Sequence, residues 1–503
     1  MKDIRGKMAR GAAWMVAFKM LERCLALTST LVLVRVLVPA DFGIIAMASS
    51  LIAMLDLFSA FGLDVALIQR PGNSREHYDT AWTLNIIAGA SVSCIMLAMA
   101  WPISWFYHEP RLVLVVCLLA PNALIQGSEN IGIVAFRKEM DFRKEFRFLL
   151  SRRMVAVALT LPMAILLRNY WALVIGMLGG RIGGVILSYA FHPFKPRLSL
   201  AKVGDFFHFS KWVMVQNVLT FLKERAADLI IGRVLGAHSL GVFNVSNEIA
   251  SIPGTELIAP INRAVLPGYA LLANDRPALR REFLSVMAIV AVVALPAVTG
   301  IACVAPFVVA AILGPKWHEA TTVLAVLAFY GIFQAILSNA YSAFLAIGKP
   351  QTFVRITAVY VAIDLPLLLL FTHTLGVVGA AWAHIVAVVV TLPLSVMLIS
   401  RDLGLKVRDL VAEAWRPLVA SGVMFAVVTT LRPHVDVETL PTAEAVKLLA
   451  LYVPLGAAAY TATIVGLWRL SGKPQGAEAS LLRQLVHRWG AVLAVVASAF
   501  RRK

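Results

Sequence analysis

The sequence predicts an all-α integral membrane protein of about 14 transmembrane helices, arranged as two pseudo-symmetric six-helix lobes plus two C-terminal helices. Of the 503 residues, 60% are hydrophobic and 15% are charged, whereas soluble domains are nearer half apolar and a quarter charged. Apolar stretches of the roughly 20 residues that a spanning helix needs recur along the chain. Lys and Arg gather in every second break between these stretches, which is the pattern that the positive-inside rule produces.

The apolar stretches define the expected spans, and the breaks between them define their orientation. The spans lie near 12–37, 42–66, 80–105, 112–135, 148–167, 170–190, 208–232, 240–265, 284–312, 320–346, 353–372, 376–399, 417–431 and 447–467. Cations occur in the N-terminal segment and in every second break, as at Arg137 and Lys138, whereas intervening breaks such as 38–41 and 372–375 are short and contain few. Both termini are therefore expected on the cytoplasmic side.

An internal repeat predicts the domain organisation. Trp14 and Trp212 each lie 21 residues before an Arg-Val-Leu sequence, at 35–37 and 233–235, and Gly43 matches Gly241 at the same offset. The first expected helix pair therefore resembles the seventh and eighth helices without gaps. The expected domains are an N-terminal six-helix lobe (1–200), a C-terminal six-helix lobe (201–400), two additional transmembrane helices (401–470) and a cytoplasmic amphipathic tail (471–503). Two related lobes that rock about a central cavity suit an alternating-access transporter.

The remaining composition argues against other classes of protein. The net charge of +18 is spread over alternate loops rather than one basic face, so no nucleic-acid partner is expected. The chain has no GxxxxGK[ST] phosphate loop, no HExxH, no GxSxG and no paired metal-ligand spacing. No cofactor, no metal and no catalytic residues are therefore expected, and the chain is interpreted as a transporter rather than an enzyme.

Ionisable side chains inside the expected spans are the candidate functional residues. Each costs at least about 2.5–3.5 kcal/mol to insert, so it normally faces a partner or a wet cavity. They gather in the first, second, seventh and eighth expected helices. The candidate cavity residues are Lys19, Glu22, Arg23, Asp56, Lys211, Asn217, Lys223, Glu224, Arg225, Asp228, Asn247 and Glu248. The alternative is internal pairing, as Lys19–Glu22, Lys223–Glu224 and Arg225–Asp228.

Three acids are candidates for ion coupling, namely Asp228, Glu248 and Asp364. Asp364 is a lone acid in the eleventh expected helix, and it suits a helix-packing partner equally well. Two other features receive structural interpretations. Arg152 and Arg153 lie near a cytoplasmic helix end and are expected to snorkel. The spacing of Gly176, Gly180 and Gly184 predicts close helix packing.

Three segments resemble a known family. They are the sequence RVLVPADFG at 35–43, the sequence DLIIGRVLGAHSLGVFN at 228–244 and the sequence INRAVLP at 261–267. All three resemble the Wzx-type flippases of the polysaccharide-exporter branch, and among them the colanic-acid-exporter-like group, of the multidrug/oligosaccharidyl-lipid/polysaccharide (MOP) exporter superfamily. In pattern the resemblance covers residues 8–400.

The resemblance implies a function. It implies that the chain moves an undecaprenyl-diphosphate-linked oligosaccharide repeat unit from the cytoplasmic to the periplasmic leaflet of the bacterial inner membrane, for exopolysaccharide or lipopolysaccharide biosynthesis. The implied partners are the lipid-linked oligosaccharide, membrane lipids, a coupling proton or sodium ion, and the polymerase and chain-length proteins of the same pathway. A diphosphate favours a cationic cavity, which Lys19, Arg23, Lys211, Lys223 and Arg225 could provide.

Three alternatives stay open. A lipid-linked peptidoglycan precursor flippase would also have 14 spans and a cationic cavity. An ion-coupled exporter of small molecules such as drugs would have a cavity dominated by acids and aromatic residues, whereas Lys and Arg are at least as frequent among the candidates here. A membrane glycosyltransferase or polymerase would need a large extracytoplasmic loop, which the spans expected here do not leave room for.

Overall fold

The computed structural model describes part of the chain in backbone and most of that part in side chains. The described backbone covers residues 2–59, 67, 74–139, 141–203, 211–433 and 435–472, and side chains are described there except at 2–13, 16, 56–59 and 211–216. All regular elements in this described part are helices, and many are long and apolar, which confirms the predicted all-α membrane fold class.

Packing divides the chain into two compact units, unit 1 (Met1–Asn244) and unit 2 (Val245–Lys503). This division follows contacts within one conformation, so it does not test the predicted domains 1–200, 201–400 and 401–470, which stay predictions. The predicted amphipathic tail, 471–503, lies outside the described residues from residue 473 onward.

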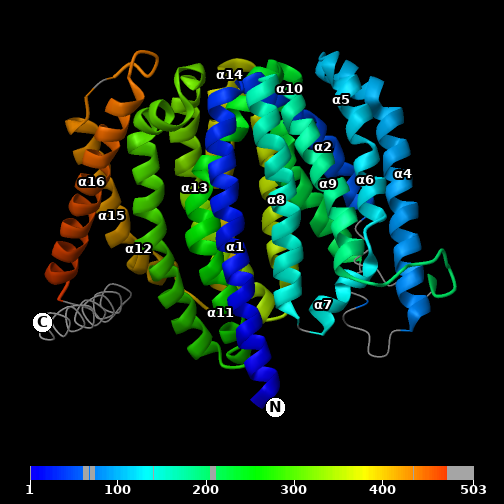
Figure 1. Cartoon of the computed structure of the whole chain (residues 1–503). Coiled ribbons are helices and arrows are strands. Elements are labelled where there is room, and N and C mark those ends of the chain that lie inside the picture. The colour runs from blue at the N-terminus through cyan, green and yellow to red at the C-terminus, as the bar shows by residue number, and fades with distance from the viewer. Residues whose placement is uncertain are drawn as a thin grey trace, which may run out of the picture. The chain divides into compact units, whose positions relative to one another are not determined.

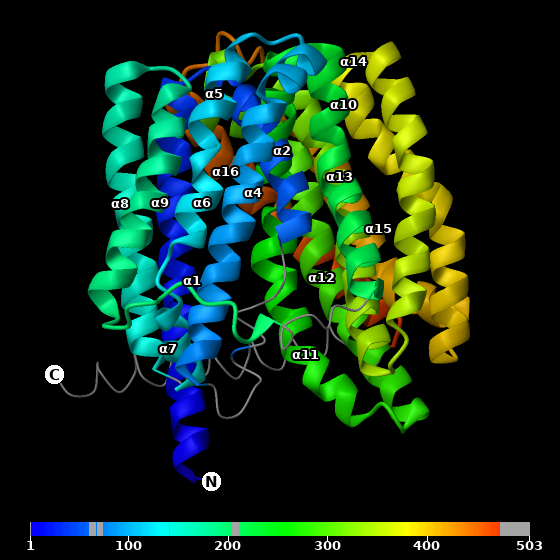
Figure 2. The same cartoon turned by 90° about the vertical axis from the view of Figure 1, so that its right-hand side faces the viewer.

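Unit 1 is a bundle of long helices with one broken segment. It contains α1 (Lys2–Val36), α2 (Pro39–Ser59), α4 (Arg75–Tyr107), α5 (Arg111–Leu119), α6 (Pro121–Gly127), the 3-10 turn η1 (Ile131–Ile133), α7 (Val134–Lys138), α8 (Phe142–Leu167), α9 (Trp171–Phe191) and most of α10 (Lys211–Ala250). Asp141 caps α8, because its Oδ1 accepts a hydrogen bond from the Lys144 backbone N–H at 3.2 Å. Figures 1 and 2 show α1, α8 and α9 side by side.

Unit 2 is built around two apolar clusters. It contains η3 (Pro253–Ile258), α11 (Ala259–Leu271), α12 (Arg276–Val308), η4 (Val309–Leu313), η5 (Pro315–Trp317), α13 (Ala320–Ala346), α14 (Pro350–Leu403), α15 (Val407–Leu431) and α16 (Thr442–Leu470). Phe283 and Phe344 lie in the cluster that joins α11 to α14, and Phe307 and Met424 lie in the one that joins α12 to α15 and α16. Burial of these side chains holds the helices of unit 2 together.

The helix α14 folds back on itself at Gly376. Its 54 residues would extend about 81 Å as one straight helix, whereas a membrane has a hydrocarbon core of about 30 Å. Gly376 has φ 65° and ψ −150°, a conformation that glycine adopts readily. His384 Nδ1 lies 2.8 Å from Asp364 Oδ1, although 20 residues of straight helix would hold them about 30 Å apart. α14 therefore consists of two antiparallel limbs.

The helix α10 has the same design. Gly236 has φ 82° and ψ −175° and interrupts the helix. The Asn244 side chain lies near the Asp228 carboxylate, and these residues lie eight positions to either side of Gly236. The limbs before and after Gly236 are therefore also antiparallel.

The helices make the chain a multi-pass membrane protein. Nine helices of the described chain are long and apolar enough to cross a membrane, or ten if the bent pair Arg111–Gly127 and Ile131–Lys138 is one span. This count takes α14 and the run Asn217–Leu271 as one helix each, although each contains an antiparallel turn. The predicted number of about 14 spans stays a prediction.

The start of α2 packs on the segment of α10 just after Gly236 through a reciprocal pair of glycines. A Cβ on Gly43 would lie 1.8 Å from the Ala237 carbonyl oxygen, and a Cβ on Gly241 would lie 1.8 Å from the Pro39 carbonyl oxygen. Gly43 and Gly241 are 198 positions apart in the sequence, and so are Pro39 and Ala237. The repeat therefore maps this contact onto itself, as a two-fold axis would. Figures 1 and 2 both show α2 beside α10.

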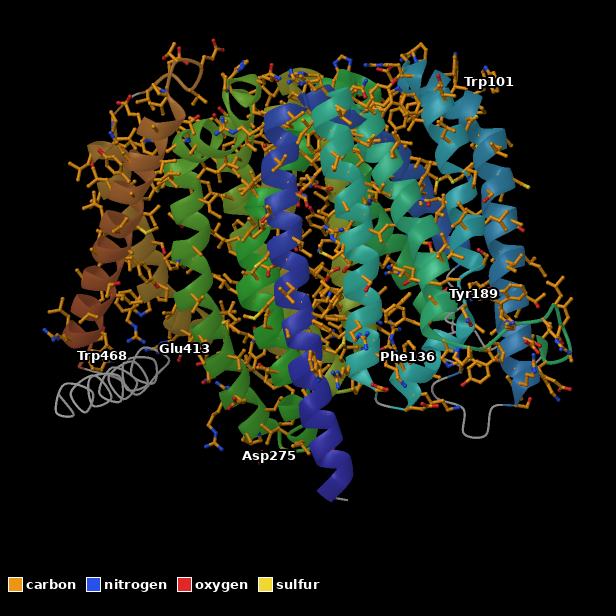
Figure 3. The ribbon with its side chains drawn as sticks, viewed as in Figure 1. Trp101, Phe136, Tyr189, Asp275, Glu413 and Trp468 are labelled. Atoms are coloured by element: carbon orange, nitrogen blue, oxygen red, sulfur yellow. The ribbon has the colours of Figure 1, made fainter. Side chains whose placement is uncertain are left out.

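Exposed tryptophans mark one end of unit 1. Trp101 is 72% exposed and Trp105 is 78% exposed, both near the end of α4. Figure 3 shows Trp101 at this end and Phe136 near the opposite end of the same unit. Because tryptophan is enriched where a membrane meets water, this end is expected to lie at an interface.

Candidate cavity for an anionic ligand

Unit 1 contains a cavity of about 830 Å³. Residues of α1, α2, α7, α8 and α9 line it, with most of the wall supplied by α8 and α9. The wall includes Phe142 at the first turn of α8, so the cavity reaches the end of the bundle at which α8 begins. A cavity of this size can hold a drug-sized ligand.

Glycines on α9 let that helix approach α8 closely and so shape the wall. A Cβ on Gly176 would lie 1.9 Å from Thr160 Oγ1, and a Cβ on Gly184 would lie 2.8 Å from Arg152 Cδ. Gly180 makes an equally close approach, at 2.8 Å from the Ala156 Cβ. These distances confirm the close helix packing that the glycine spacing predicts.

The cavity wall carries more positive than negative charge. It is lined by five cations and two acids, which are Lys19, Arg137, Arg152, Arg153 and Arg181, and Glu22 and Glu145. Arg137 Nε lies 2.5 Å from Glu145 Oε1, and Lys19 Nζ lies 2.7 Å from Glu22 Oε2. Both acids are thus neutralised by a neighbouring cation in the same wall. Because attraction strengthens as the effective dielectric constant falls, this excess of cations over acids in the wall favours an anionic ligand.

Two of these further cations lie next to each other on α8. Arg152 packs on the ring of Phe148 at 5.7 Å and lies 3.5 Å from Glu129. Arg153 makes no hydrogen bond or ion pair with any residue that the structure describes, and its Nε is buried. A buried guanidinium nitrogen without an acceptor is unfavourable, so Arg153 is the cation in the wall that most needs an external anion.

A second charged pair lies on the first limb of α10. Arg225 Nη1 lies 3.0 Å from Asp228 Oδ2, and the Asp228 side chain is 3% exposed. The Tyr107 ring lies close to Gly232, one turn further along, and its hydroxyl is 3.0 Å from Ser50 Oγ. Asp228 is therefore enclosed by α4, α10 and the Arg225 guanidinium.

The structure assigns the candidate residues of the sequence to different places. Lys19 and Glu22 line the cavity, and Arg23 is the next residue of α1. The candidates on the first limb of α10 are Asn217, Lys223, Glu224, Arg225 and Asp228, whereas Asn247 and Glu248 are exposed near its end, within unit 2. The side chains of Asp56 and Lys211 lie outside the described residues. The pairs Lys19–Glu22 and Arg225–Asp228 form as internal pairing requires, and a single cavity that contains all the candidates stays a prediction.

Sequence reasoning missed four of the arginines that line the cavity. Arg137 looks like an ordinary cytoplasmic loop cation, Arg181 is a single cation in an apolar stretch, and Arg152 and Arg153 were expected to snorkel. In the structure all four belong to the wall. A usable signal was the glycine spacing, because the contacts of Gly180 and Gly184 bring the α9 segment around Arg181 against the α8 segment that carries Arg152.

Asp364 has partners that the sequence did not suggest. Its Oδ1 lies 2.8 Å from His384 Nδ1 and accepts a hydrogen bond from the Tyr360 hydroxyl at 3.3 Å. The Tyr360 hydroxyl lies 3.0 Å from that of Tyr330 on α13. The sequence did not suggest His384 as a partner because the two residues are 20 positions apart and meet only across the turn at Gly376.

Comparison with known proteins identifies relatives of the whole chain. The chain is 23% identical over 428 residues to the lipopolysaccharide biosynthesis protein WzxC of Escherichia coli K12, which covers 83% of this chain and 86% of WzxC. It is also 23% identical over 468 residues to an uncharacterised membrane protein in the cps region of Klebsiella pneumoniae, covering 92% of this chain and 95% of that protein. These relatives confirm the resemblance to Wzx-type flippases of the MOP superfamily.

A solved structure shows a similar fold. The lipid II flippase MurJ, in an inward closed conformation, superimposes with a TM-score of 0.69 at 11% sequence identity, covering 91% of this chain and 99% of MurJ. At that identity the similarity concerns the fold alone. The model of one family, described as "Polysaccharide biosynthesis protein", matches residues 32–322, which is more than half of the chain. The chain therefore belongs to this family of polysaccharide biosynthesis proteins.

Proposed function

We propose that the chain flips an undecaprenyl-diphosphate-linked oligosaccharide repeat unit from the cytoplasmic to the periplasmic leaflet by alternating access. The observation that carries this proposal is the cationic cavity of unit 1, in which Arg153 has no acidic partner among the described residues. A diphosphate offers several acceptor oxygens and negative charge, which are what a group of arginines binds well. The relatives named for lipopolysaccharide biosynthesis support the same substrate class.

The dimensions of the cavity support binding of the headgroup. About 830 Å³ is enough for a diphosphate and the sugar next to it, while the polyprenyl chain stays among the lipids. The wall contains Arg137 and Phe142, which adjoin a loop rich in Lys and Arg. By the positive-inside rule this loop is cytoplasmic, so the cavity is positioned to receive the substrate from the cytoplasmic leaflet.

The same proposal predicts the membrane location, the orientation and the partners of the chain. We expect it in the bacterial inner membrane, with both termini in the cytoplasm, because cations mark every second break of the sequence. We expect it to act as a transporter without catalysis of its own. Its partners would be membrane lipids, and the polymerase and chain-length proteins that use the translocated unit.

The peptidoglycan precursor is the second candidate substrate. The fold shared with a lipid II flippase favours it, and that precursor also presents a diphosphate to a cationic wall. An exporter of cationic small molecules is less consistent with the excess of arginines that line the cavity. The two flippase functions differ in the cell, because loss of the first removes a surface or secreted polysaccharide and loss of the second stops wall synthesis.

The test is complementation of a deletion strain. Deletion is expected to abolish the polysaccharide while the lipid-linked repeat unit accumulates on the cytoplasmic face. Arg153→Gln should bind the headgroup about tenfold to a hundredfold more weakly, because a hydrogen bond to a charged group contributes about 1.5–3 kcal/mol. Arg153→Lys should restore part of the output because it keeps the charge.

Arg147→Gln is the matched control. Arg147 lies on the same helix, is exposed and packs on the ring of Phe191 outside the cavity. The Arg147→Gln variant should leave polysaccharide output unchanged at equal expression. Normal polysaccharide in the deletion strain, together with new sensitivity to small cationic compounds, would refute the proposal and favour the exporter.

A further inference from the structure

Unit 2 encloses a cluster of four titratable side chains inside the membrane span. Asp364 and His384 come from the two limbs of α14, Tyr360 comes from the first limb, and Tyr330 comes from α13. Asp364 is 1% exposed, and His384 and Tyr360 are each 6% exposed. The rings of Tyr330 and His384 also stack, with centroids 5.3 Å apart. The cluster therefore connects three helical segments, and its three members on α14 have almost no contact with solvent.

The cluster lies at bilayer depth. Asp364 is 12 residues from the turn at Gly376 and 14 residues from Pro350, where α14 begins, so it lies about 18–21 Å from either end of its limb. An ionised carboxylate at such depth costs at least about 2.5–3.5 kcal/mol. An unbalanced charge here therefore destabilises this arrangement of helices.

The geometry requires at least one proton between Asp364 and His384. Oδ1 and Nδ1 are 2.8 Å apart, and two lone pairs facing each other at that distance would repel, so one of the two atoms carries a hydrogen. With that hydrogen on Nδ1 and none on Nε2, the pair carries one negative charge. A further proton on Nε2 makes the imidazole positive and the pair neutral overall. The titrating proton thus decides whether a net charge is buried.

The surroundings suit a proton better than a metal cation. The hydrogen-bond partners of Asp364 Oδ1 are the Tyr360 hydroxyl, which donates to it, and His384 Nδ1. A hard cation would need several additional oxygen ligands, and the described residues contain no group of three or more His, Cys, Asp or Glu side chains arranged to hold a metal ion.

On α12 and α15, which pack on α14, the charged groups lie in the first turns of α12 and in the first half of α15. On α12 the charged residues are Arg276, Arg280, Arg281 and Glu282, all in its first turns, and on α15 they are Arg408, Asp409, Glu413 and Arg416. Arg276 contacts Asp402 at the end of α14, and Arg280 pairs with Asp409. On α13 the only titratable residues are Tyr330 and Tyr341. Asp364 is the carboxylate that lies in direct contact with His384, at 2.8 Å.

We propose that Asp364 and His384, supported by Tyr360 and Tyr330, form a proton-binding site that couples proton movement to the conformational cycle, and this inference rests on the transport function proposed above. One proton binds from the aqueous phase while the site is open and is held while the site is enclosed, as it is in this structure. The bound proton stabilises the enclosed arrangement because it leaves no net charge in the span. Loss of the proton leaves one unbalanced carboxylate and favours separation or hydration of the α14 limbs.

Proton counting tests the site without any substrate. Full-length protein in lipid nanodiscs is titrated in weak buffer between about pH 5 and 8, where histidine changes charge. Asp364→Asn and the double variant Asp364→Asn/His384→Gln should each bind about one proton fewer than the wild type over that range, because neither keeps a carboxylate that can balance or accept the proton. Asp402→Asn is the matched control, because Asp402 is also buried in unit 2 but is held by Lys349 at 3.0 Å and Thr352 at 2.7 Å, with no imidazole partner. The Asp402→Asn variant should bind as many protons as the wild type over the same pH range.

Polysaccharide output then tests the coupling. Asp364→Asn should lower output at least about fivefold at equal expression, the lower end of ordinary coupling factors. Unchanged proton binding in both Asp364→Asn and Asp364→Asn/His384→Gln overturns the site, and using two variants covers the case in which one of them does not fold. Lost proton binding with unchanged output overturns the coupling. If the deletion strain accumulates no lipid-linked unit, the flippase function fails, while the titration still decides whether the proton site exists.

Discussion

The reciprocal contact between Gly43 and Gly241 can be disturbed by a single methyl group. The Cβ of Gly43→Ala would lie 1.8 Å from the Ala237 oxygen and 2.6 Å from the Ala237 carbonyl carbon. All three of the nearest atoms belong to backbone, so no side chain can rotate away. The α2 segment and the turn of α10 must therefore move apart.

The size of the effect follows from the contact distances. A carbon and a carbonyl oxygen normally approach to about 3.3–3.6 Å, so the helices must separate by roughly 1.5 Å or more at this point. Overpacking of this kind costs about 1–3 kcal/mol, which corresponds to about a 5–150-fold shift toward conformations that lack the contact. Gly241→Ala should act to the same extent, because its Cβ would also lie 1.8 Å from a carbonyl oxygen, that of Pro39. The double variant should lose less than the sum, since one separation relieves both clashes.

The assay is labelling of a buried reporter cysteine. Ser50→Cys places a thiol on α2 two turns beyond Gly43, at a position that is 0% exposed. In a background in which the 4 native cysteines are replaced, the rate of reaction with a membrane-impermeant maleimide reports how often α2 and α10 part. Gly43→Ala and Gly241→Ala should raise this rate within the range given above.

The control is Gly300→Ala, because a Cβ on Gly300 would meet no atom within 4 Å. It adds the same methyl group to a transmembrane helix and should leave the labelling rate unchanged. Equal labelling rates in Gly43→Ala, Gly241→Ala and Gly300→Ala would refute the reasoning, because the glycine contact would then not limit opening.

Two further predictions concern unit 1. Gly180→Leu should lower the Tm of the purified protein by thermal scanning, because a Cβ there already lies 2.8 Å from the Ala156 Cβ and overpacking costs about 1–3 kcal/mol; an unchanged Tm would contradict the close packing of α8 and α9. The hydrogen bond from Arg111 holds the pKa of Glu109 below its ordinary value of 4.5. This pair therefore stabilises the fold above about that pH, and the stabilisation is lost as pH falls through the lowered pKa. Its contribution is at most about 1 kcal/mol, because the Arg111 side chain is half exposed. Glu109→Gln should therefore reduce Tm at neutral pH but not at pH values below the lowered pKa, and an equal reduction at both would contradict the assignment.

The fold class could be predicted from the sequence because it depends on composition and periodicity. The backbone N–H and C=O groups of a long apolar stretch can all form hydrogen bonds in a bilayer when the stretch is a helix. The close approach at Gly180 follows from the spacing of small residues alone. The ion pair Lys19–Glu22 was also visible, because residues three apart share one helix face. Each of these features is local in the sequence.

The contacts that could not be predicted depend on which helices meet. The wall that Arg137, Arg152 and Arg181 share is assembled by tertiary packing of α7, α8 and α9. Asp364 and His384 are a partial exception. They lie at nearly equal distances from the expected break at 372–375, so an antiparallel turn at that break brings them to the same depth. The break and both residues were visible, but pairing across the turn also requires the rotation of each limb, which the sequence pattern does not supply.

The reciprocal glycines also explain why the compact units separate after Asn244 and not near residue 200. In the predicted repeat α10 belongs to the second copy, yet its residues Ala237 and Gly241 pack on Pro39 and Gly43 of the first copy, and Gly232 packs on Tyr107. The predicted repeat describes the order of similar segments along the sequence, whereas the compact units reflect the contacts that exist in one conformation. If the two copies move relative to each other, as alternating access requires, the contact that joins Pro39–Gly43 to Ala237–Gly241 must break and re-form. A contact that the repeat maps onto itself is suited to this role, because both copies gain and lose the same interactions when it opens.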